Sequence, residues 1–218
     1  MQAQPEVRVE SIYSHLAESD IQNSSHVLEQ IERFESLSNQ IQSGLNYPLK
    51  RHILNSAGIH NYSNAHFDRV RLGIGMYGLS SNKEWESQLK PAISWYSRVS
   101  QVKTINPDES VGYNRHFVAE KTTKIAVIPV GYADGFRRLL GNGQAGVYIQ
   151  NTFCPTVGSV CMDMIMVDLG ELEIEVGELV EIIGKNQSIT TLARQCQTIP
   201  YEILTGLSER MERVYIES

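Results

Sequence analysis

The chain has 218 residues, of which 41% are hydrophobic and 20% are charged, a balance that argues against wholesale disorder. The net charge is −6 and no basic run occurs, so we expect no nucleic-acid partner. No apolar run approaches the roughly 20 residues that cross a bilayer, and the polar N-terminus lacks the apolar core of a signal peptide. Three cysteines without metal-ligand spacing predict no metal site and suit a reducing compartment, which makes the cytoplasm the default expectation.

The first part of the chain begins with a predicted strand and a predicted helix. Residues 7–14 alternate in character and are rich in β-branched side chains, which indicates a strand with His15 at its end. Ser24 or Ser25 is expected to cap a helix, because apolar residues then recur at helical spacing. Gly44 is expected to end this helix in the C′ position.

Two further strands are predicted before residue 88. One covers residues 51–56, and the other covers 68–72 and runs into the glycine-rich stretch 73–78. Strands joined by a helix and a connection are typical of parallel α/β structure. Three strands and one helix cannot cover both faces of a parallel sheet, so this α/β part is expected to be incomplete.

After Lys90-Pro91 the pattern changes to short strands separated by turns. Helices are expected from Thr190 to Cys196 and from Pro200, since proline suits the first position of a helix. The predicted strands cover residues 97–105, 124–130, 146–149, 161–169, 179–183 and 213–216. We therefore predict an α/β part at residues 1–88 and a mainly β domain at 89–218.

Two Gly-Tyr pairs flank the apolar strand predicted at residues 124–130. Gly112-Tyr113 precedes this strand and Gly131-Tyr132 follows it. Both phenols would then lie on loops held by one rigid element, where binding and catalytic residues usually occur. The pattern alone is more typical of turn residues than of a functional site.

Eight short motifs occur in an order that matches a known family. They lie at residues 14–20 (SHLAESD), 52–57 (HILNSA), 71–78 (RLGIGMYG), 111–113 (VGY), 131–135 (GYADG), 160–163 (VCMD), 200–202 (PYE) and 210–214 (RMERV). With these motifs the chain resembles the C-terminal part of the alanine racemases, pyridoxal-phosphate (PLP) enzymes with a TIM-like barrel and a C-terminal β domain. The resemblance implies that residues 1–88 hold the last strands of that barrel.

One departure from the family concerns the lysine that binds PLP covalently. Family members carry it upstream, in a Val-Lys-Ala-(Asp/Asn)-Ala-Tyr-Gly context, together with an arginine for the substrate carboxylate and a tyrosine for the cofactor phosphate. None of the lysines present has these surroundings: Lys50, Lys83, Lys90, Lys103, Lys121, Lys124 and Lys185. The resemblance therefore implies a fragment that starts before the last three barrel strands and is inactive alone.

Racemisation needs one base on each face of the substrate Cα. In the family a lysine serves one face and a tyrosine of the partner subunit serves the other, and Tyr113 matches that tyrosine. A phenol has a pKa near 10, so it needs positive charge or strong hydrogen bonds to act near neutrality. The resemblance implies a chain of contacts from Tyr113 through His15 and Arg71 to His52. The structural alternative for His15 is a core histidine bonded to backbone.

Arg71 is expected to face the pyridine nitrogen of PLP. Because a guanidinium does not give up its proton, that nitrogen would stay unprotonated and the cofactor would be a weaker electron sink. The alternative is a surface arginine at a strand end.

The remaining expected contacts bind the cofactor phosphate and the substrate. Ser56, Tyr201 and the backbone N–H groups of Gly73 and Ile74 would bind the phosphate. The resemblance further implies that the backbone N–H of Met162 binds the substrate carboxylate from the partner subunit. It also implies that Tyr132 and Asp163 shape the entrance, although core packing is the default expectation for Met162.

The resulting hypothesis is the C-terminal part of a homodimeric racemase that interconverts L- and D-alanine with PLP for peptidoglycan synthesis. A close variant would act on serine or on several amino acids. A second hypothesis is a non-catalytic dimerisation or cofactor-binding module of a split or fused protein. A third, a fold-related PLP decarboxylase, is less favoured because such sites place an acid at the pyridine nitrogen.

Overall fold

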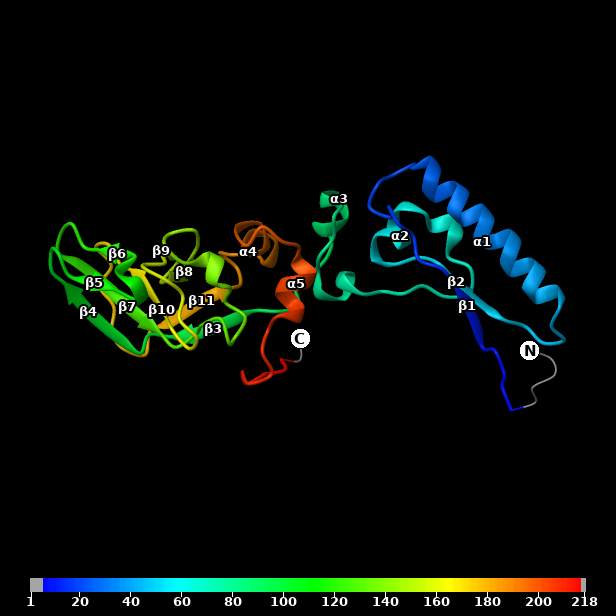
Figure 1. The fold of residues 1–218 in the computed structure, drawn as a ribbon. Helices are drawn as coiled ribbons and strands as arrows, with labels where there is room; N and C mark the ends of the chain where they lie inside the picture. Colours follow the sequence, from blue (N-terminus) through cyan, green and yellow to red (C-terminus); the bar gives the residue numbers. More distant parts are fainter. Residues whose placement is uncertain (1–5, 217–218) are drawn as a thin grey trace. The chain divides into compact units, whose positions relative to one another are not determined.

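The structure, a computed structural model, describes residues 6–216 (Figure 1). The chain divides into two compact units between Ala92 and Ile93. The domain boundary placed at residue 88 by the sequence stays a prediction. None of the helices in the described part is long and apolar enough to cross a membrane.

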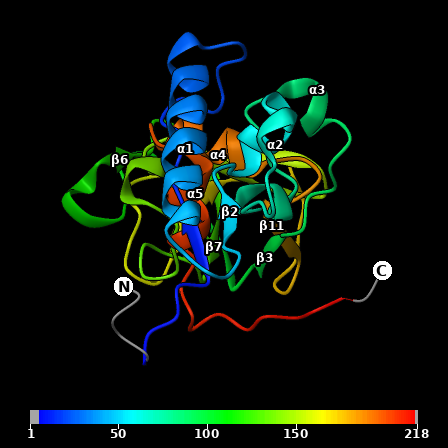
Figure 2. The same ribbon diagram turned by 90° about the vertical axis from the view of Figure 1, so that its right-hand side faces the viewer.

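The first unit is built on two parallel strands and the long helix that connects them. Strand β1 (Ser11–Tyr13) pairs with β2 (Lys50–His52), with Ser11 opposite Lys50. Helix α1 (Ser25–Ser43) lies beside this pair in both views (Figures 1 and 2). The sequence placed this helix correctly.

Both ends of α1 have identifiable caps. The Ser24 hydroxyl accepts a hydrogen bond from the Val27 N–H at 3.4 Å, as an N-cap residue does. Gly44 is the C-cap, and its N–H donates to the Ile41 carbonyl at 3.1 Å. Gly44 therefore ends the helix as predicted, but as the C-cap with a right-handed φ of −86° and not in the predicted C′ position.

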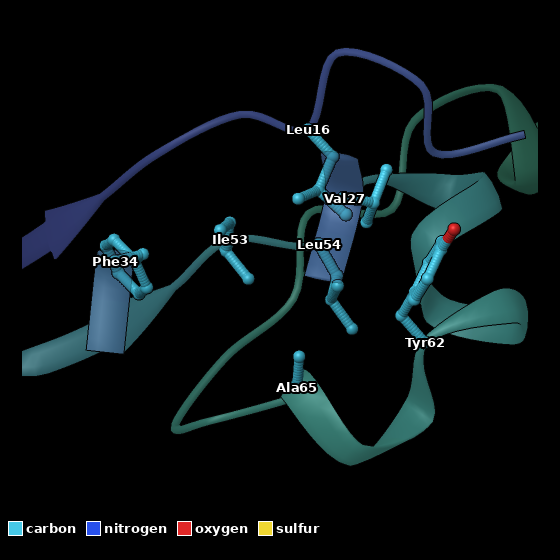
Figure 3. Packing of buried hydrophobic residues seen from close by; sticks show 7 residues of the cluster. All are labelled: Leu16, Val27, Phe34, Ile53, Leu54, Tyr62 and Ala65. Atoms are coloured by element: carbon cyan, nitrogen blue, oxygen red, sulfur yellow. The ribbon is translucent and has the colours of Figure 1, made fainter. Parts of the chain in front are cut away.

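A small apolar core joins α1 to the strand ends (Figure 3). Val27 and Phe34 come from α1, while Ile53 and Leu54 directly follow β2, and all four are buried. Leu16, Tyr62 and Ala65 complete the cluster. This core fixes the segment after β2 against the helix, and that segment carries the candidate site residues described below.

The strand predicted at residues 68–72 does not form. The Asp68 and Arg69 N–H groups both point to the Arg51 carbonyl, and the Arg71 N–H points to the Leu54 carbonyl. These scattered bonds do not make a ladder. The Arg71 guanidinium also donates hydrogen bonds to backbone carbonyl oxygens at the strand ends. A neighbouring strand would otherwise donate its N–H groups to these oxygens. The segment therefore forms no strand.

Short helices fill the rest of the first unit, and the sequence reading missed them. Asn55 caps α2 and Asn82 caps α3, each through its side-chain oxygen. Their bounds are α2 (Ser56–Asn61), η1 (Ser63–Ala65), η2 (Ile74–Tyr77) and α3 (Lys83–Glu86).

The second unit consists mainly of antiparallel β-sheets. Its strands are β3 (Trp95–Arg98), β4 (Gln101–Ile105), β5 (Ser110–Val111), β6 (Phe117–Val118), β7 (Thr123–Ile128), β8 (Gly146–Ile149), β9 (Thr152–Pro155), β10 (Ile165–Asp168) and β11 (Leu179–Ile183). One sheet has the order β10-β7-β4, a second has the order β3-β11-β8-β9, and β5 pairs with β6. The apolar run predicted as a buried strand is β7, at the centre of the first sheet.

The second unit also contains short helices, and the last two of them lie near its end. They are η3 (Tyr113–Arg115), η4 (Arg138–Leu140), α4 (Ile189–Gln195) and α5 (Pro200–Thr205). Pro200 occupies the first turn of α5, as predicted. The strand predicted at residues 213–216 is wrong: the chain after α5, red in Figure 2, has no regular structure up to Ile216. These apolar residues lie exposed, with no strand beside them to form a ladder.

The fold class follows from the two units. A partial α/β domain is followed by a mainly β domain, as the sequence predicted. Within residues 6–216 the strands form no closed barrel.

Candidate functional site

Arg71 is the centre of a polar cluster in the first unit. Its Nη1 donates to Nδ1 of His52 at 2.8 Å. Its Nη2 donates to the carbonyl oxygens of Ser14, at 2.8 Å, and Ile53, at 3.1 Å. Nδ1 of His15 lies 3.2 Å from the same Nη2. The structure thus brings together three predicted site residues, Arg71, His52 and His15, at the ends of β1 and β2.

The rings around this cluster are stacked. The Tyr13 ring lies over the His52 ring with centroids 5.4 Å apart, and the Arg71 guanidinium lies 5.2 Å from the Tyr13 centroid. Burial lowers the pKa of His52 below its ordinary value, and the positive charges of Arg71 and Arg69 lower it further. The lowered pKa favours the neutral form of His52, in which Nδ1 can accept from Arg71.

Replacing Arg71 with methionine should raise the pKa of His52 toward 6.5, the ordinary value for histidine. The largest cause of the present lowering, burial, remains in the variant, so the rise should be partial. The folded pKa of His52 lies below its unfolded pKa, near 6.5. Its contribution to the free energy of unfolding is therefore fully present above pH 6.5 and is lost as the pH falls through the folded pKa. Titration by NMR would measure the change, with His66 as the reference signal. An unchanged His52 would contradict the role of Arg71.

His15 has a second polar neighbour that the sequence did not reveal. The amide Nδ2 of Asn55 lies 3.3 Å from Nε2 of His15. Gln30 on α1 also donates to the His15 carbonyl oxygen at 2.6 Å. His15 is exposed, so it is not the core histidine of the structural alternative, and its ring faces two polar side chains. An asparagine directly before a helix is an N-cap signal, and that signal could have drawn attention to Asn55.

Ser56 and the turn after Arg71 form a group of hydrogen-bond donors. The Ser56 hydroxyl, only 4% exposed, accepts from the N–H groups of Gly73, at 2.9 Å, and Gly75, at 3.2 Å. These contacts use its lone pairs and leave its own hydrogen to donate. The Ile74 N–H has no acceptor among residues 6–216.

The space above Gly73 is open. A Cβ built there would meet only Ser56 Oγ, at 3.8 Å. The Ser56 hydroxyl lies at this space and the Ile74 N–H follows it in the chain, and a phosphate group suits two such donors. The Gly73 N–H itself is already used by Ser56.

Tyr113 lies on an exposed loop of the second unit. It begins η3, its side chain is 70% exposed, and its hydroxyl forms no hydrogen bond within residues 93–216. Gly112, Asn114 and Arg115 all have positive φ, at 78°, 60° and 53°. Such conformations are costly for residues other than glycine, so the loop must be held by its surroundings.

Contacts with the turn at Gly158-Ser159 hold this loop. A Cβ at Gly158 would come within 2.7 Å of the Val111 carbonyl oxygen, which shows how closely the two backbones approach. The Ser159 hydroxyl lies 3.1 Å from Nδ1 of His116, at the far end of the Tyr113 loop. The turn continues toward Met162.

Tyr132 and Met162 lie on two loops joined by backbone hydrogen bonds. The Tyr132 N–H donates to the Cys161 carbonyl and the Ala133 N–H donates to the Met162 carbonyl, both at 3.0 Å. A Cβ at Gly131 would overlap these two carbonyl groups. The side chains of Tyr132 and Met162 are exposed, at 46% and 53%. Two predicted substrate residues thus share one backbone frame.

One arginine joins the same two loops through carboxylates. Nε of Arg210 donates to Asp134 at 2.6 Å, and its Nη2 donates to Asp163 at 2.7 Å. Burial alone would raise the pKa of Asp134, but hydrogen bonds from Arg210 and from the Gly131 N–H lower it below its ordinary value. Arg210 and Asp134 lie in two of the eight family motifs, but the motifs do not predict that the two residues form an ion pair.

Replacing Arg210 with glutamine should make the protein less stable at neutral pH and less resistant to acid. Because the folded pKa of Asp134 is lowered, its contribution to stability is present above the unfolded pKa near 3.9. That contribution is lost as pH falls through the folded pKa. The difference in urea midpoint between the two proteins should therefore be larger at pH 7 than at pH 3. An equal difference at both pH values would show that Arg210 acts through other contacts.

Tyr201, the remaining predicted phosphate ligand, lies in the first turn of α5 in the second unit, where its side chain is 51% exposed. The predicted residues thus fall into two sets. The first unit holds the Arg71 cluster, Ser56, Gly73 and Ile74. The second holds Tyr113, Tyr132, Met162, Asp163 and Tyr201.

Comparison with protein families shows to which family the chain with these two sets of residues belongs. Residues 92–215 match the family model described as "Alanine racemase, C-terminal domain", and residues 1–81 match "Alanine racemase, N-terminal domain". The chain belongs to the alanine racemase family.

Individual alanine racemases agree with this assignment. "Alanine racemase 2" of Caldanaerobacter subterraneus is 37% identical over 96% of this chain and 56% of its own length. The alanine racemase of Symbiobacterium thermophilum is 38% identical over 96% of this chain and 57% of its own length. The chain therefore spans less than two thirds of these relatives.

Solved alanine racemase structures are similar as well. The enzyme from Streptomyces lavendulae has a TM-score of 0.90 at 32% identity, covering 100% of this chain and 59% of its own. The Bacillus anthracis enzyme with bound L-Ala-P has a TM-score of 0.90 at 31% identity, covering 98% and 56%. The Bartonella henselae enzyme, described with covalently bound pyridoxal phosphate, has a TM-score of 0.86 at 33% identity, covering 97% and 58%.

Proposed function

We propose that this chain is the C-terminal part of a PLP-dependent alanine racemase that interconverts L- and D-alanine, supplying D-alanine for peptidoglycan precursors in the cytoplasm. The observation that carries the proposal is the Arg71 cluster. The Arg71 guanidinium is held by two histidines and by three carbonyl oxygens at the strand ends, so the fold itself sets its direction, and it stands beside the donors of Ser56 and Ile74.

These residues fit PLP. When bound, PLP would supply the electron sink that makes the substrate Cα–H acidic. Arg71 would face the ring nitrogen and, as a permanent donor, keep it unprotonated. The Ser56 hydroxyl and the Ile74 N–H would bind the phosphate, and Tyr201 would add a phenol. His52 would hold Arg71 in place through the 2.8 Å contact.

Tyr113 would be one of the two catalytic bases. Its exposed phenol, on a loop fixed by Val111 and by the His116–Ser159 contact, is suited to enter the site of a partner subunit in a homodimer. It would remove or return the Cα proton on one face. His15 would stand between the phenol and Arg71. The lysine of the upstream segment would serve the other face.

The substrate would be bound by the second unit of the partner. The Met162 N–H would bind the carboxylate of alanine, while Tyr132 and Asp163 would line the entrance. Arg210 would position Asp163, since it bonds to this carboxylate at 2.7 Å.

A second candidate function is a non-catalytic dimerisation or cofactor-binding module. The absence of the family's lysine motif from the 218 residues favours it. A racemase acting on serine or on several amino acids is a variant of the first proposal.

A fusion would test the proposal. The upstream segment of the Symbiobacterium thermophilum relative, with its lysine, would be joined to this chain, and racemisation of L- and D-alanine would be measured by polarimetry and chiral chromatography. We expect the fusion to racemise alanine and the 218-residue chain alone to be inactive. A serine assay in parallel would separate the substrate alternatives.

In the fusion, Ser56→Ala should weaken PLP binding. Ser80→Ala is the matched control and should leave PLP binding unchanged. A fusion that folds and binds PLP but does not racemise any amino acid would overturn the catalytic proposal. It would favour the cofactor-binding module instead.

A further inference from the structure

The backbone of Arg51 faces the edge of β2 that no strand covers. Its two neighbours bond to β1: the Lys50 N–H donates to the Glu10 carbonyl at 3.1 Å, and the His52 carbonyl accepts from the Ser14 N–H at 3.3 Å. Because neighbouring residues of a strand direct their backbone groups to opposite edges, those of Arg51 point away from β1. In the described part of the first unit β2 pairs with β1 alone, so this edge needs other partners.

Asp68 supplies a partner for each of these two backbone groups. Its Oδ2 accepts from the Arg51 N–H at 2.7 Å, and its own N–H donates to the Arg51 carbonyl at 3.0 Å. A neighbouring strand would bond to such an edge through its backbone, whereas here a carboxylate replaces the strand carbonyl. A hydrogen bond to a carboxylate is also shorter and stronger than one to a neutral carbonyl.

The carboxylate gives the segment a second point of attachment to β2. The N–H groups of Asp68 and Arg69 both donate to one atom, the Arg51 carbonyl oxygen, and a segment held at one atom can still rotate about it. The bond from the Arg51 N–H to Asp68 removes that freedom. Arg51 directly precedes His52, and Asp68 lies three positions before Arg71. The two-point attachment is therefore close in the chain to both residues of the 2.8 Å contact between Nη1 of Arg71 and Nδ1 of His52.

The chain reaches Asp68 through a strained turn at Phe67. Phe67 has a φ of +48°, a left-handed conformation that is rare for a bulky side chain. The Arg51 guanidinium lies 5.1 Å from the centroid of its ring, and the ring of Phe34 on α1 meets it edge-on at 5.4 Å. Arg51 also donates to Oδ1 of Asn39 on α1 at 2.8 Å. Such strain persists only where the surroundings hold it, so α1 and β2 together fix how the chain enters this segment.

We propose that Asp68 is a positioning residue for Arg71: its carboxylate takes the place of a strand carbonyl at the open edge of β2, and so sets the register in which Arg71 meets His52. An ion pair with the Arg51 side chain is the competing explanation. Nε of Arg51 lies 3.9 Å from Oδ2 of Asp68, and 30% and 36% of the two side chains are exposed, so this pair contributes little. The short contact is the one to the Arg51 backbone.

The consequence for catalysis rests on the proposed function, in which Arg71 faces the ring nitrogen of PLP. Misplacing a group at a reaction site by about 1 Å can lower the rate by about 10²-fold. Asp68 would therefore affect racemisation through Arg71, without touching substrate or cofactor itself. The positioning itself can be tested without any reaction.

The test is the pKa of His52, measured by NMR titration of the 218-residue chain without PLP or substrate. Asp68→Ala removes the acceptor and should release Arg71 and Arg69, whose positive charges help to lower the pKa of His52. We therefore expect this pKa to rise toward its ordinary value, in part only, because burial remains. Loss of a negative charge would by itself lower the pKa of a nearby histidine. A rise therefore identifies the release of the arginines.

Asp68→Asn is the conservative companion variant. Asparagine has the same shape and keeps an oxygen that can accept from the Arg51 N–H, but it carries no charge. The pKa of His52 should therefore not rise in this variant. Glu32→Ala is the matched control, because it removes a carboxylate from the exposed face of α1 and should leave the pKa of His52 unchanged. His116 in the second unit provides the reference signal.

Two results would overturn the proposal: a pKa of His52 that does not rise in Asp68→Ala, or one that rises equally in Asp68→Asn. The second result would show that the charge, and not the acceptor, holds the segment. If Asp68→Ala does not fold, hydrogen exchange of the unaltered chain decides. A protected Arg51 N–H supports the proposal, and exchange as fast as in an unfolded chain contradicts it. Because none of these measurements involves racemisation, a fusion without activity would leave the result intact, and a failed test here would leave the proposed function intact.

Discussion

Replacing Tyr113 with phenylalanine in the fusion should slow racemisation by about 10²–10⁴-fold, the usual contribution of a general acid–base group. Phenylalanine keeps the ring and removes only the hydroxyl, and that hydroxyl forms no hydrogen bond within its own unit. The loop should therefore keep its fold. PLP binding should be unchanged, because Tyr113 is not among the proposed cofactor ligands.

The measurement should treat the two enantiomers separately. Exchange of the Cα proton with deuterated water should be lost for the enantiomer whose proton faces Tyr113 and retained for the other. Tyr96→Phe, at a similarly exposed tyrosine on β3, is the control and should have no effect. Loss of PLP from Tyr113→Phe, or equal losses for both enantiomers, would contradict a base on one face.

Replacing Gly131 with alanine should destabilise the second unit by about 3 kcal/mol, the upper part of the usual range for overpacking. The added Cβ would overlap the carbonyl groups of Cys161 and Met162, and backbone cannot move aside as a flexible side chain can. The hydrogen bonds from Tyr132 and Ala133 to those carbonyls would be strained at the same time. Urea unfolding would measure the loss.

Gly143→Ala is the control for this prediction. Gly143 has a φ of +77° and no atoms within 4 Å of an added Cβ, so alanine there costs only backbone strain, about 1 kcal/mol. If both variants lose equal stability, the loss at Gly131 does not come from close backbone approach. In the fusion, Gly131→Ala should also weaken substrate binding, because the Met162 loop would move.

Elements with local signals could be predicted from the sequence. Helix α1 has a serine at its start, apolar residues at helical spacing and a glycine at its end, and β11 is mainly apolar, with Glu181 at its centre. Residues 68–72 and 213–216 carry the same β-branched pattern and form no strand. Pairing depends on a partner elsewhere in the chain, which local sequence does not contain.

The site divides in the same way. Motif order pointed to His15, His52 and Arg71, and the structure brings these three together. Their proposed roles still await the experiments above. The N-cap pattern marks Asn55, but the contacts of Asn55 and Arg210 could not be predicted, because their partners lie far away in the sequence. Asn55 meets His15 across 40 positions and Arg210 meets Asp134 across 76.

The pairing of Arg210 with two carboxylates restricts how this chain can change. Asp134 and Asp163 bond to different nitrogens of one guanidinium, Nε and Nη2. Lysine has a single nitrogen and could keep only one of these contacts in the same geometry. Loss of the arginine alone would leave the buried carboxylate of Asp134, which is 5% exposed, without its counterion. We therefore expect Arg210, Asp134 and Asp163 to be replaced together, and not one at a time, in proteins that evolve from this sequence.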